Sequence, residues 1–417
     1  MLQKICVIGL GYIGIPTSVL LADKGYRVFG CDIKVTTVEM LNKGQLPLVE
    51  PGLEPRLEKV VASGRFSAHL TPQQSDVYML CVPTPSYGHS GNHAPNLSYI
   101  FSAATAIASL LKAGDTVILE STSPVGTTEA VSDFLRNLGV DVSVLDIAYC
   151  PERIFPGNAL AELAENDRIV GGLTARATEA VCAFYRTFVT GSVLGTNART
   201  AEMSKLVENS YRDVNIAFAN ELSILCHNQQ INVWDLIALA NRHPRVNILQ
   251  PGPGVGGHCI AVDPWFLVAQ DPENAVLIRR AREVNLSKTE WTLARIAQAV
   301  NAHVAAHGSV PVIGCFGLAF KADIDDIRES PSLAIARRLQ SQGQVVMNVE
   351  PNISEVDGLT LVTAEHALNI CDIRVILVKH RAFAGLEWSS GKKSAQTLDF
   401  CGAQRAPMKD AAVRLAA

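Results

Sequence analysis

A glycine-rich turn between two short apolar segments constrains the N-terminal fold more than any other feature of the chain. Residues 4–8 (KICVI) are typical of a strand, and Gly9-Leu10-Gly11-Tyr12-Ile13-Gly14 follows at once. An apolar helical pattern then runs from Pro16 to Lys24, and a second strand pattern, Arg27 to Cys31, ends at Asp32. This order of strand, GxGxxG, helix, strand and acidic residue predicts one βαβ unit of a dinucleotide-binding fold.

The same turn predicts which cofactor binds. Gly9, Gly11 and Gly14 permit a tight turn and let a pyrophosphate approach the backbone at the helix N-terminus. Asp32 is placed to accept hydrogen bonds from the adenosine ribose hydroxyls, and its charge would repel a 2′-phosphate. We therefore expect NAD rather than NADP. The alternative is a glycine-rich turn that binds no ligand.

Hydroxyl-rich loops follow two further strand patterns. Val77 to Val82 leads into Pro83-Thr84-Pro85, and Thr116 to Glu120 leads into residues 121–128 (STSPVGTT). In a doubly wound sheet the ligand lies at the carboxyl ends of the strands, so Thr84, Thr122 and Thr128 are candidate contacts to a cofactor or sugar. Helix N-capping is the alternative role for each of these threonines.

Two polar segments are candidate substrate contacts. The strand pattern Asp146 to Cys150 precedes the segment PERIFPG, in which Glu152 and Arg153 could form a surface ion pair or point into an active site. The segment NRHPR contains Arg242, His243 and Arg245, a set of side chains that suits a pyrophosphate.

From Asn197 to Asn228 the pattern predicts one long helix that joins two α/β halves. Lys205, Asn209 and Arg212 are spaced i, i+4 and i+7, so they share one face. The helix is apolar around most of its circumference, which predicts burial, and a buried Lys-Asn-Arg stripe needs anionic or hydroxyl-rich partners. We expect this stripe to contact a ligand; a solvated polar face is the alternative.

The segment Gln250 to Pro264 (QPGPGVGGHCIAVDP) combines glycines and prolines with a thiol and a carboxylate. Glycines let the backbone turn tightly and let a ligand lie close to it. The other nine of the ten cysteines lie in apolar segments typical of a core, whereas Cys259 lies in this glycine-rich loop. We predict that Cys259 is a nucleophile, with Asp263 beside it; a cysteine that merely fills space is the alternative.

A second α/β region begins at Val310, where PVIGCFGLAF predicts a strand that ends in glycine. Further strand patterns cover Gln344 to Glu350 and Ile373 to Val378. The chain is therefore predicted to be α/β, with two Rossmann-like domains of parallel sheet joined by a long central helix and a helical middle domain. The expected boundaries are 1–196, 197–306 and 307–417.

Composition excludes several other classes of protein. The 417 residues are 48% hydrophobic and 18% charged with a net charge of −4, as in a compact globular protein of two or three domains. No basic run predicts binding to nucleic acid or a membrane surface, and no apolar run approaches the ~18 residues of a membrane span. The scattered cysteines favour a reducing compartment over disulfides or a metal site. We expect a soluble cytoplasmic protein without a bound metal.

Together the motifs resemble the UDP-glucose/GDP-mannose dehydrogenase family across nearly the whole chain. The segments that carry the resemblance are VIGLGYIGIP, LVEPGL, VPTP, ILESTSPVGTT, YCPERIFPG, RTAEMSKLVENSYRDVNIAFANELS, NRHPRVNILQPGPGVGGHCIAVDPWF and CFGLAFKADIDDIRESP. The segment around the loop cysteine resembles the mannosamine-type branch, which implies UDP-N-acetyl-D-mannosamine as substrate. The family pattern also implies NAD in the N-terminal domain, UDP in the C-terminal domain and a homodimer built on the long helix.

The resemblance implies a four-electron oxidation in which the sugar C6 alcohol becomes a carboxylate and two NAD are reduced. Cys259 matches the nucleophile, which would form a thiohemiacetal and then a thioester. Lys205 matches an acid/base or oxyanion-stabilising lysine, and Asn209 matches the asparagine beside it. Asp263 would act with an ordered water, and Glu152 would help thioester hydrolysis. A thiolate is needed only where the aldehyde must become a hydride donor again, which agrees with a double oxidation.

The resemblance also assigns binding residues. Matches to UDP-sugar contacts are Arg153, Ile154, Lys205, Asn209, Arg212, His243, Arg245, Gly256, Phe320 and Lys321. Matches to NAD contacts, beyond the three turn glycines and Thr122, are Tyr12, Ile13, Asp32, Thr84, Thr128 and Arg328. The alternatives are the same chemistry on UDP-N-acetylglucosamine, UDP-glucose or GDP-mannose, a two-electron hydroxyacid dehydrogenase, and a non-catalytic nucleotide-binding protein.

The chain departs from the family pattern in two places. Ala261-Val262 stands where the UDP-glucose relatives have a lysine before the aspartate. In Asp399-Phe400-Cys401-Gly402, Cys401 stands where the family usually has a lysine. If that lysine contacts the nucleotide in the family, this chain is expected to bind the nucleotide more weakly.

Overall fold

The computed structural model describes residues 3–48, 50–85, 94–154, 158–257 and 259–404. The chain forms two compact units. Unit 1 contains Met1–Asn209 and Trp265–Pro272, and unit 2 contains Ser210–Pro264 and Glu273–Ala417. The three-domain boundaries expected from the sequence stay a prediction.

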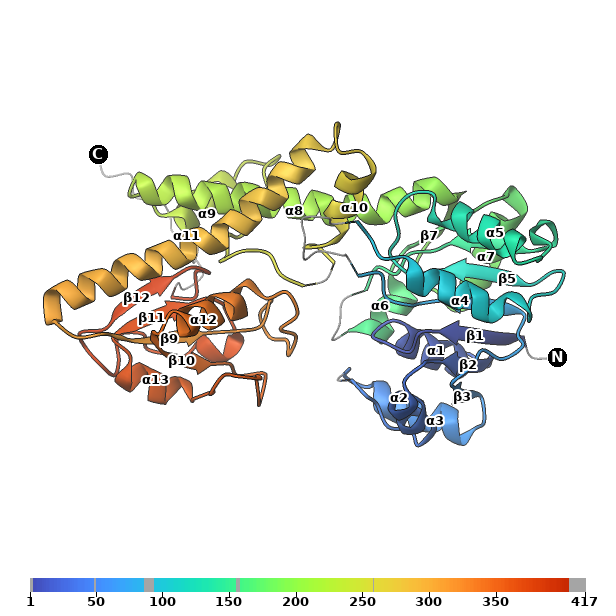
Figure 1. Cartoon of the computed structure of the whole chain (residues 1–417), viewed down its shortest axis with the longest axis horizontal. Helices are drawn as coiled ribbons and strands as arrows, with labels where there is room; N and C mark the ends of the chain where they lie inside the picture. Colours follow the sequence, from blue (N-terminus) through green and yellow to red (C-terminus); the bar gives the residue numbers. More distant parts are fainter. Residues whose placement is uncertain (1–2, 49, 86–93, 155–157, 258, 405–417) are drawn as a thin grey trace. The chain divides into compact units, whose positions relative to one another are not determined.

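Unit 1 is built on an eight-stranded sheet in the order β3-β2-β1-β4-β5-β6-β7-β8 (Figure 1). Its strands are β1 (Lys4–Ile8), β2 (Arg27–Cys31), β3 (Phe66–His69), β4 (Val77–Leu80), β5 (Thr116–Leu119), β6 (Asp146–Tyr149), β7 (Arg168–Gly172) and β8 (Val193–Asn197). The order 3-2-1-4-5-6 of the first six strands is that of a dinucleotide-binding fold, which confirms the expected Rossmann-like region.

The sheet of unit 1 is not parallel throughout. β7 pairs with β6 in the antiparallel sense, and β8 runs parallel to β7. Because antiparallel neighbours run in opposite directions, β7 begins at the edge of the sheet at which β6 ends. This route keeps Glu152 and its neighbours at the edge where a doubly wound sheet binds its ligand.

Helices cover both faces of this sheet because its strands are apolar on both sides. Along β1, Ile5 and Val7 belong to one hydrophobic cluster, whereas Cys6 and Ile8 belong to the other. Such alternation is expected of a strand buried on both faces. The helices are α1 (Gly14–Asp23), α2 (Val35–Asn42), α3 (Leu53–Ala62), α4 (Ser98–Ala108), α5 (Thr127–Asn137), α6 (Ala159–Glu165) and α7 (Ala175–Tyr185), with a short 3-10 turn, η1 (Val142–Val144).

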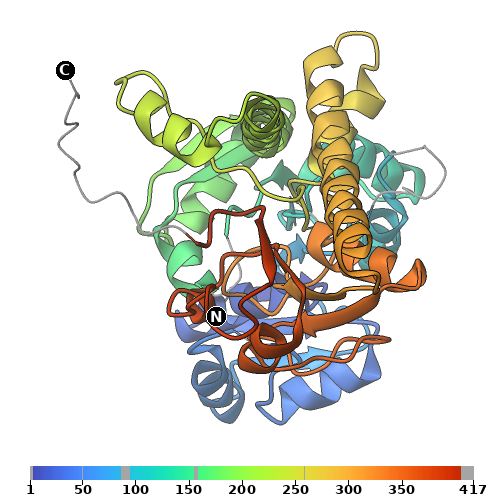
Figure 2. The ribbon, with the colours of Figure 1, turned by 90° about the vertical axis from the view of Figure 1, so that its left-hand side faces the viewer.

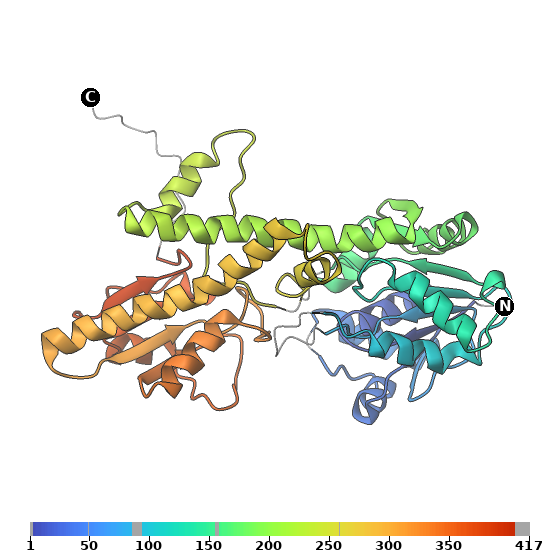
Figure 3. The ribbon, with the colours of Figure 1, turned by 45° about the horizontal axis from the view of Figure 1, so that its top comes forward.

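The predicted long helix is confirmed as α8 (Ala198–Asn228), which runs unbroken in Figure 3 and is viewed along its axis in Figure 2. Its N-terminal part belongs to unit 1 and the rest to unit 2. The expected burial of α8 is only partly correct. Five large apolar side chains on it are between 43% and 71% exposed: Met203, Val207, Tyr211, Phe218 and Leu225. Their spacing of four or seven residues places them on one face, called here the α8 stripe.

Unit 2 contains a second, smaller Rossmann-like sheet, as predicted. Its four strands, β9 (Val312–Phe316), β10 (Val345–Val349), β11 (Ile373–Ile376) and β12 (Gln396–Asp399), are all parallel in the order β10-β9-β11-β12. Its remaining elements are α9 (Val233–Ala240), α11 (Val276–His307), α12 (Pro331–Ser341), α13 (Ala364–Ile370) and η2 (Arg381–Phe383). The helix α10 (Asp263–Gln270) begins in unit 2 and continues into unit 1.

A buried lysine lies between α8 and α11 in unit 2. Lys288 is 2% exposed, its Nζ donates to Ser223 Oγ at 2.7 Å, and Nζ lies 3.7 Å from the centroid of the Trp291 ring. Burial lowers the pKa of Lys288 to about 7, because the charged form loses its hydration.

Replacing this lysine should change how stability depends on pH. The folded pKa lies below the unfolded value, so burial of the charge opposes folding; this penalty is absent above about pH 10.5 and grows as the pH falls towards 7. Lys288→Met keeps the length of the side chain without the charge. We expect its apparent Tm to exceed that of the wild type at neutral pH, with a gap that narrows as the pH rises. Thermal unfolding over this range would test this, with exposed Lys24→Met as control. A difference in Tm between Lys288→Met and the wild type that stays constant with pH would contradict this prediction.

Candidate active site

The glycine turn of unit 1 leaves room for a dinucleotide. Gly9 has a φ of +97°, and a Cβ there would lie 2.7 Å from Cys81 O; a Cβ on Gly14 would lie 1.8 Å from Gly9 O. A Cβ on Gly11 would meet no heavy atom within 4 Å. The N-cap residue of α1, Ile13, makes no side-chain cap. Gly9 and Gly14 are therefore required by packing, whereas the space beside Gly11 and the start of α1 suit a pyrophosphate.

Asp32 lies where the second strand ends, as predicted. Its Oδ2 accepts from Leu10 N at 2.9 Å and its Oδ1 accepts from Lys34 N at 2.9 Å. These bonds orient a half-buried carboxylate whose oxygens still have lone pairs for ribose hydroxyls. The neighbouring Ile33 and Val35 are 84% and 53% exposed, an apolar surface suited to an adenine ring that the sequence reasoning missed. These residues fit NAD.

The three candidate threonines have different partners. Thr84 Oγ1 donates to Thr122 O at 2.7 Å, which joins the loops after β4 and β5. Thr128 Oγ1 and Thr128 N both donate to Glu202 Oε1 at 2.7 Å. Thr128 thus lies inside the first turn of α5 and does not cap it, because the N-cap residue is Gly126. Cofactor contact by these threonines stays a prediction.

Glu202 on α8 takes the role of that missing cap. Its Oε2 accepts from Gly126 N at 2.6 Å, so its two oxygens together accept from two backbone N–H groups at the start of α5, those of Gly126 and Thr128. The side chain is fully buried, and this burial raises the pKa of Glu202 against the lowering effect of its hydrogen bonds. The sequence reasoning missed this residue. The one signal for it was an acidic residue one helical turn before Lys205.

Lys205 and Glu152 form a buried ion pair in unit 1. Lys205 Nζ lies 3.0 Å from Glu152 Oε1 and donates to Glu152 O at 2.7 Å. Glu152 Oε2 accepts from Ile154 N at 2.9 Å. The carboxylate is therefore directed at the lysine rather than at its sequence neighbour Arg153, which pairs instead with Glu208 at 2.8 Å. Glu208, also on α8, is a second residue that the sequence reasoning missed.

The region behind Glu152 contains further buried charge. Glu120 accepts from Tyr185 OH at 2.6 Å and from Cys81 Sγ at 3.2 Å. Burial raises the pKa of Glu120, and the buried Arg168 guanidinium opposes this rise. The Lys205–Glu152 pair thus lies next to a second acid and a second cation, in surroundings that hold water away and strengthen charge interactions.

The loop cysteine immediately precedes α10 in unit 2. Cys259 is half-buried, and its carbonyl oxygen accepts from Asp263 N at 2.8 Å and from Val262 N at 3.1 Å. Asp263, 3% exposed, begins the helix. A helix N-terminus stabilises nearby negative charge, which suits a thiolate nucleophile. His258, the residue before Cys259, lies outside the described residues.

Close packing explains why glycines precede the cysteine. A Cβ on Gly256 would lie 2.6 Å from Glu329 O and 2.7 Å from Phe320 Cβ. Gly257 N donates to Arg328 O at 3.1 Å. The structure thereby brings together three predicted ligand contacts, Gly256, Phe320 and Arg328, within unit 2.

A cavity of about 150 Å³ lies at the carboxyl ends of β9, β11 and β12. The strand order of this sheet changes direction between β9 and β11, and such a switch point is where open α/β sheets bind ligands. Its lining residues are Gly252, Pro253, Gly254, Phe320, Lys321, Ala322, Pro331, Ser332, Leu377, Val378, Lys379 and Cys401. Two lysines and the start of the cysteine loop thus share one cavity.

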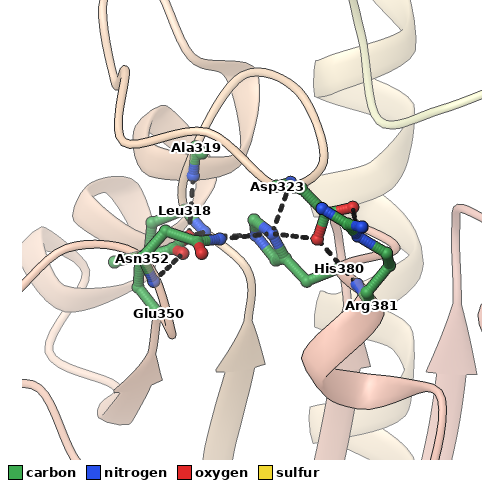
Figure 4. A network of polar contacts seen from close by, with 7 residues as sticks. All are labelled: Leu318, Ala319, Asp323, Glu350, Asn352, His380 and Arg381. Carbon is green, nitrogen blue, oxygen red and sulfur yellow. Dashed lines mark hydrogen bonds and ion pairs between the residues drawn. The ribbon is translucent and has the colours of Figure 1, made fainter. Parts of the chain in front are cut away.

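A buried polar network joins the two loops that line this cavity (Figure 4). Glu350, at the end of β10, accepts from Leu318 N at 2.7 Å and from Ala319 N at 3.0 Å, and lies 3.2 Å from His380 Nε2. His380 Nδ1 accepts from Asp323 N at 3.0 Å, so the imidazole proton lies on Nε2 and points at Glu350. Asp323 in turn accepts from Arg381 N at 2.8 Å.

The charge of Glu350 is stabilised despite its burial. Burial raises the pKa of this carboxyl, but hydrogen bonds from His380, Leu318 N and Asn352 N outweigh it, and the pKa is lowered. Part of the charged segment at residues 321–329 therefore holds neighbouring loops together. Asp323 and Asp326 pair with Arg381 and Arg328 at 2.9 Å and 2.6 Å.

Three further predicted contacts, Arg212, His243 and Arg245, are exposed, whereas Asn209, Tyr12 and Ile13 are half-buried. Arg212 lies on α8, and His243 and Arg245 lie in the loop after α9, where Arg245 N donates to His243 Nδ1 at 3.3 Å. Among the residues that the structure describes, no group of three His, Cys, Asp or Glu side chains could hold a metal ion. Within the same residues no helix has the length and apolar character needed to cross a membrane.

A change at Glu202 should disturb the start of α5. Glu202→Gln keeps the size of the side chain but presents an NH2 group to backbone N–H donors. We expect a loss of about 1–3 kcal/mol in unfolding free energy and weaker NADH binding. Denaturant unfolding and a fluorescence titration with NADH would measure both effects.

Glu129→Gln is the matched control for this change. Glu129 also lies in the first turn of α5, but it is exposed and pairs with Arg199, so its loss should cost about 0–1 kcal/mol. Equal effects of the two substitutions would show that Glu202 has no special role as a cap.

Comparison with known proteins agrees with this geometry. Models of the UDP-glucose/GDP-mannose dehydrogenase family match the chain in three consecutive segments: the NAD binding domain at residues 3–189, the central domain at 199–287 and the UDP binding domain at 314–401. The chain is 48% identical over 416 residues to a UDP-N-acetyl-D-mannosamine dehydrogenase of Campylobacter jejuni, covering 96% of this chain and 99% of the relative.

Further similar proteins are named for N-acetylated nucleotide sugars, in one case with a different sugar. An NDP-N-acetyl-D-galactosaminuronic acid dehydrogenase of Ralstonia nicotianae is 50% identical over 399 residues, covering 92% of each chain. The solved structure of a UDP-D-ManNAc dehydrogenase from Pyrococcus horikoshii matches with a TM-score of 0.89 and 37% identity over 97% of each chain. The chain therefore belongs to the UDP-glucose/GDP-mannose dehydrogenase family and is an NAD-dependent nucleotide-sugar dehydrogenase that acts on a UDP-sugar.

Proposed function

We propose that this protein oxidises UDP-N-acetyl-D-mannosamine at C6 to UDP-N-acetyl-D-mannosaminuronate, with reduction of two NAD. The observation that carries the proposal is the cysteine loop: Cys259 and Asp263 follow glycines packed against Phe320, beside a cavity lined by two lysines. The choice of sugar is supported by the 48% identity to the Campylobacter jejuni enzyme named for that substrate. The relative named for an N-acetylgalactosaminuronate product makes the galacto epimer the second candidate.

In the first oxidation the C6 alcohol loses a proton and a hydride and becomes an aldehyde. NAD, when bound, supplies the hydride acceptor for each oxidation. Asp263 takes the hydroxyl proton through a water, while Lys205 stabilises the oxyanion that develops on the C6 oxygen. Glu152 holds Lys205 in place through its carboxylate and its backbone oxygen. Asn209, one turn further along α8, orients the sugar.

In the second oxidation the Cys259 thiolate adds to the aldehyde carbon. The resulting thiohemiacetal loses its hydroxyl proton and a hydride and becomes a thioester. Water then adds to the thioester carbonyl, the C–S bond breaks, and the products are the carboxylate and the free thiol. Glu152 accepts the proton of the attacking water, a role supported by its buried position among charged groups.

The cavity of unit 2 suits the UDP moiety. Lys321 and Lys379 line it together with Cys401, which stands where the family usually has a lysine. Two cations beside the cavity suit the diphosphate, so the absence of a third lysine at Cys401 does not remove its positive surroundings. The imidazole, carboxylate and backbone contacts of Figure 4 hold the two lining loops in one arrangement.

We also propose that the protein is a cytoplasmic homodimer formed through the α8 stripe. Five exposed apolar side chains aligned on one helix face would be costly in water and suit contact with a second copy of the same helix. A cytoplasmic setting is supported by the ten cysteines, all of which are free thiols.

A panel of nucleotide sugars with NADH stoichiometry tests the reaction. We expect two NADH per UDP-N-acetyl-D-mannosamine, with slower turnover of UDP-N-acetylglucosamine, UDP-glucose, GDP-mannose and the galacto epimer. Cys259→Ser should form almost no acid, because a serine hydroxyl is a far weaker nucleophile at neutral pH than a thiolate. One NADH per sugar in the wild type, with no effect of Cys259→Ser, would favour a two-electron dehydrogenase.

Substitution within the α8 stripe tests the dimer. Tyr211→Glu places a charge in the centre of the stripe and should convert a dimer into a monomer, as measured by light scattering. Leu239→Glu is the matched control, since Leu239 is 57% exposed on α9 and lies outside the stripe. A monomeric wild type, or dimers in both variants, would contradict the proposed interface.

A further inference from the structure

A seam of four buried polar side chains joins α8 to α11 within unit 2. Asp213 and Asn220 lie on α8, Arg282 and Asn285 lie on α11, and none is more than 2% exposed. Burial of this kind is costly unless the groups are paired, and apolar side chains of the same size would hold two helices together at least as well. The seam therefore calls for an explanation beyond helix packing.

The four side chains of the seam are joined by hydrogen bonds whose donors and acceptors can be assigned in only one way. Arg282 Nη1 donates to Asp213 Oδ1 at 2.6 Å. That carboxylate oxygen can only accept, so the amide that faces it at 2.8 Å is Asn285 Nδ2. Asn285 Oδ1 must then face Asn220 Nδ2, at 2.8 Å.

The end of the chain lies on the cysteine loop. With its Nδ2 turned to Asn285, Asn220 presents Oδ1 to the backbone, and Gly252 N donates to it at 2.9 Å. An asparagine amide can usually adopt either of two orientations. Here Asp213 selects the one that offers Gly252 an acceptor, because its carboxylate and its backbone oxygen both accept from Asn285 Nδ2, at 2.8 Å and 3.1 Å. The opposite orientation would place an NH2 group against the N–H of Gly252.

Gly252 begins the segment that leads to Cys259, and neighbouring contacts hold the same segment. Thr289 Oγ1 on α11 donates to Pro253 O at 3.0 Å, and Gly257 N donates to Arg328 O at 3.1 Å. The loop is thus held at three points before the cysteine. The contact from Asn220 is the first of them and the one that depends on Asp213 and Asn285.

We propose that Asp213, Asn285 and Asn220 form a positioning chain that holds the cysteine loop ready for the thiol-dependent second oxidation. The inference rests on the proposed function. The first oxidation requires no thiol, whereas the second begins only when Cys259 adds to the aldehyde. A loop that is less well held should therefore slow the second step selectively and let the aldehyde escape.

The test compares Asn220→Leu with the wild type under turnover, with hydroxylamine present to trap released aldehyde. Leucine has a similar volume but offers Gly252 no acceptor. We expect the ratio of acid to trapped aldehyde to fall about tenfold and the NADH yield to fall towards one per sugar. Gly252 also lines the cavity, but Lys321 and Lys379 stay in place, so the KM for the UDP-sugar should rise by no more than about twofold.

Ser223→Ala is the matched control. Ser223 lies one turn further along α8, donates to Asn220 O at 2.6 Å and accepts from Lys288, so its loss weakens the same helix contact without reaching the loop. It should leave the acid-to-aldehyde ratio unchanged. An equal leak of aldehyde from Ser223→Ala and Asn220→Leu would overturn the proposal, because general loosening of α8 and α11 would then explain both.

A second variant keeps the proposal testable if Asn220→Leu fails to fold. Asn285→Ala removes the group that orients the Asn220 amide but leaves Asn220 itself in place, and it should leak aldehyde to a smaller degree. If both variants fold and both keep the wild-type ratio of acid to trapped aldehyde, the positioning chain is overturned. The same holds if only Asn285→Ala folds and it keeps that ratio. A wild type that yields one NADH per sugar would instead overturn the proposed function, so the two failures are distinguishable.

Discussion

In both units an acidic residue at the end of the second strand holds the turn that follows the first strand. In unit 1 Asp32 accepts from Leu10 N, and in unit 2 Glu350 accepts from Leu318 N and Ala319 N. The glycine of each turn has a positive φ and donates to the last residue of the neighbouring strand, Gly9 to Cys31 O and Gly317 to Val349 O, each at 2.8 Å. One physical constraint, that a carboxylate must satisfy the N–H groups of a tight turn, thus shapes both candidate ligand sites.

The two carboxylates differ in whether a ligand can reach them. Asp32 is half-buried beside exposed apolar side chains, so a ribose can reach it. The Glu350 side chain is fully buried against His380 and serves the loops rather than a ligand. This difference agrees with NAD in unit 1 and a different nucleotide in unit 2, where lysines rather than a carboxylate line the cavity.

The helix α8 makes several separate contacts with candidate site residues along its length. Glu202 caps α5, and Lys205, one turn on, pairs with Glu152. Further along, Asp213 accepts from Asn285, Asn285 accepts from Asn220, and Asn220 accepts from Gly252 N in the cysteine loop. The outward face of the same helix carries the apolar stripe.

Local patterns in the sequence determined the elements and which reactive side chains they carry. The βαβ unit, the long helix, the second sheet and the loop with Cys259 follow from periodicity, glycine spacing and residue type, because these act within a few residues of chain. Tertiary structure alone decided the partners: Glu202 with the start of α5, Arg153 with Glu208 rather than Glu152, and the Asp213–Asn285–Asn220 chain. Such pairs lie 55 to 74 residues apart, and no local pattern specifies which buried donor meets which acceptor. The same reason explains the error about α8: an apolar circumference predicts contact, but whether that contact lies within the chain or on a second copy depends on what the fold places against it.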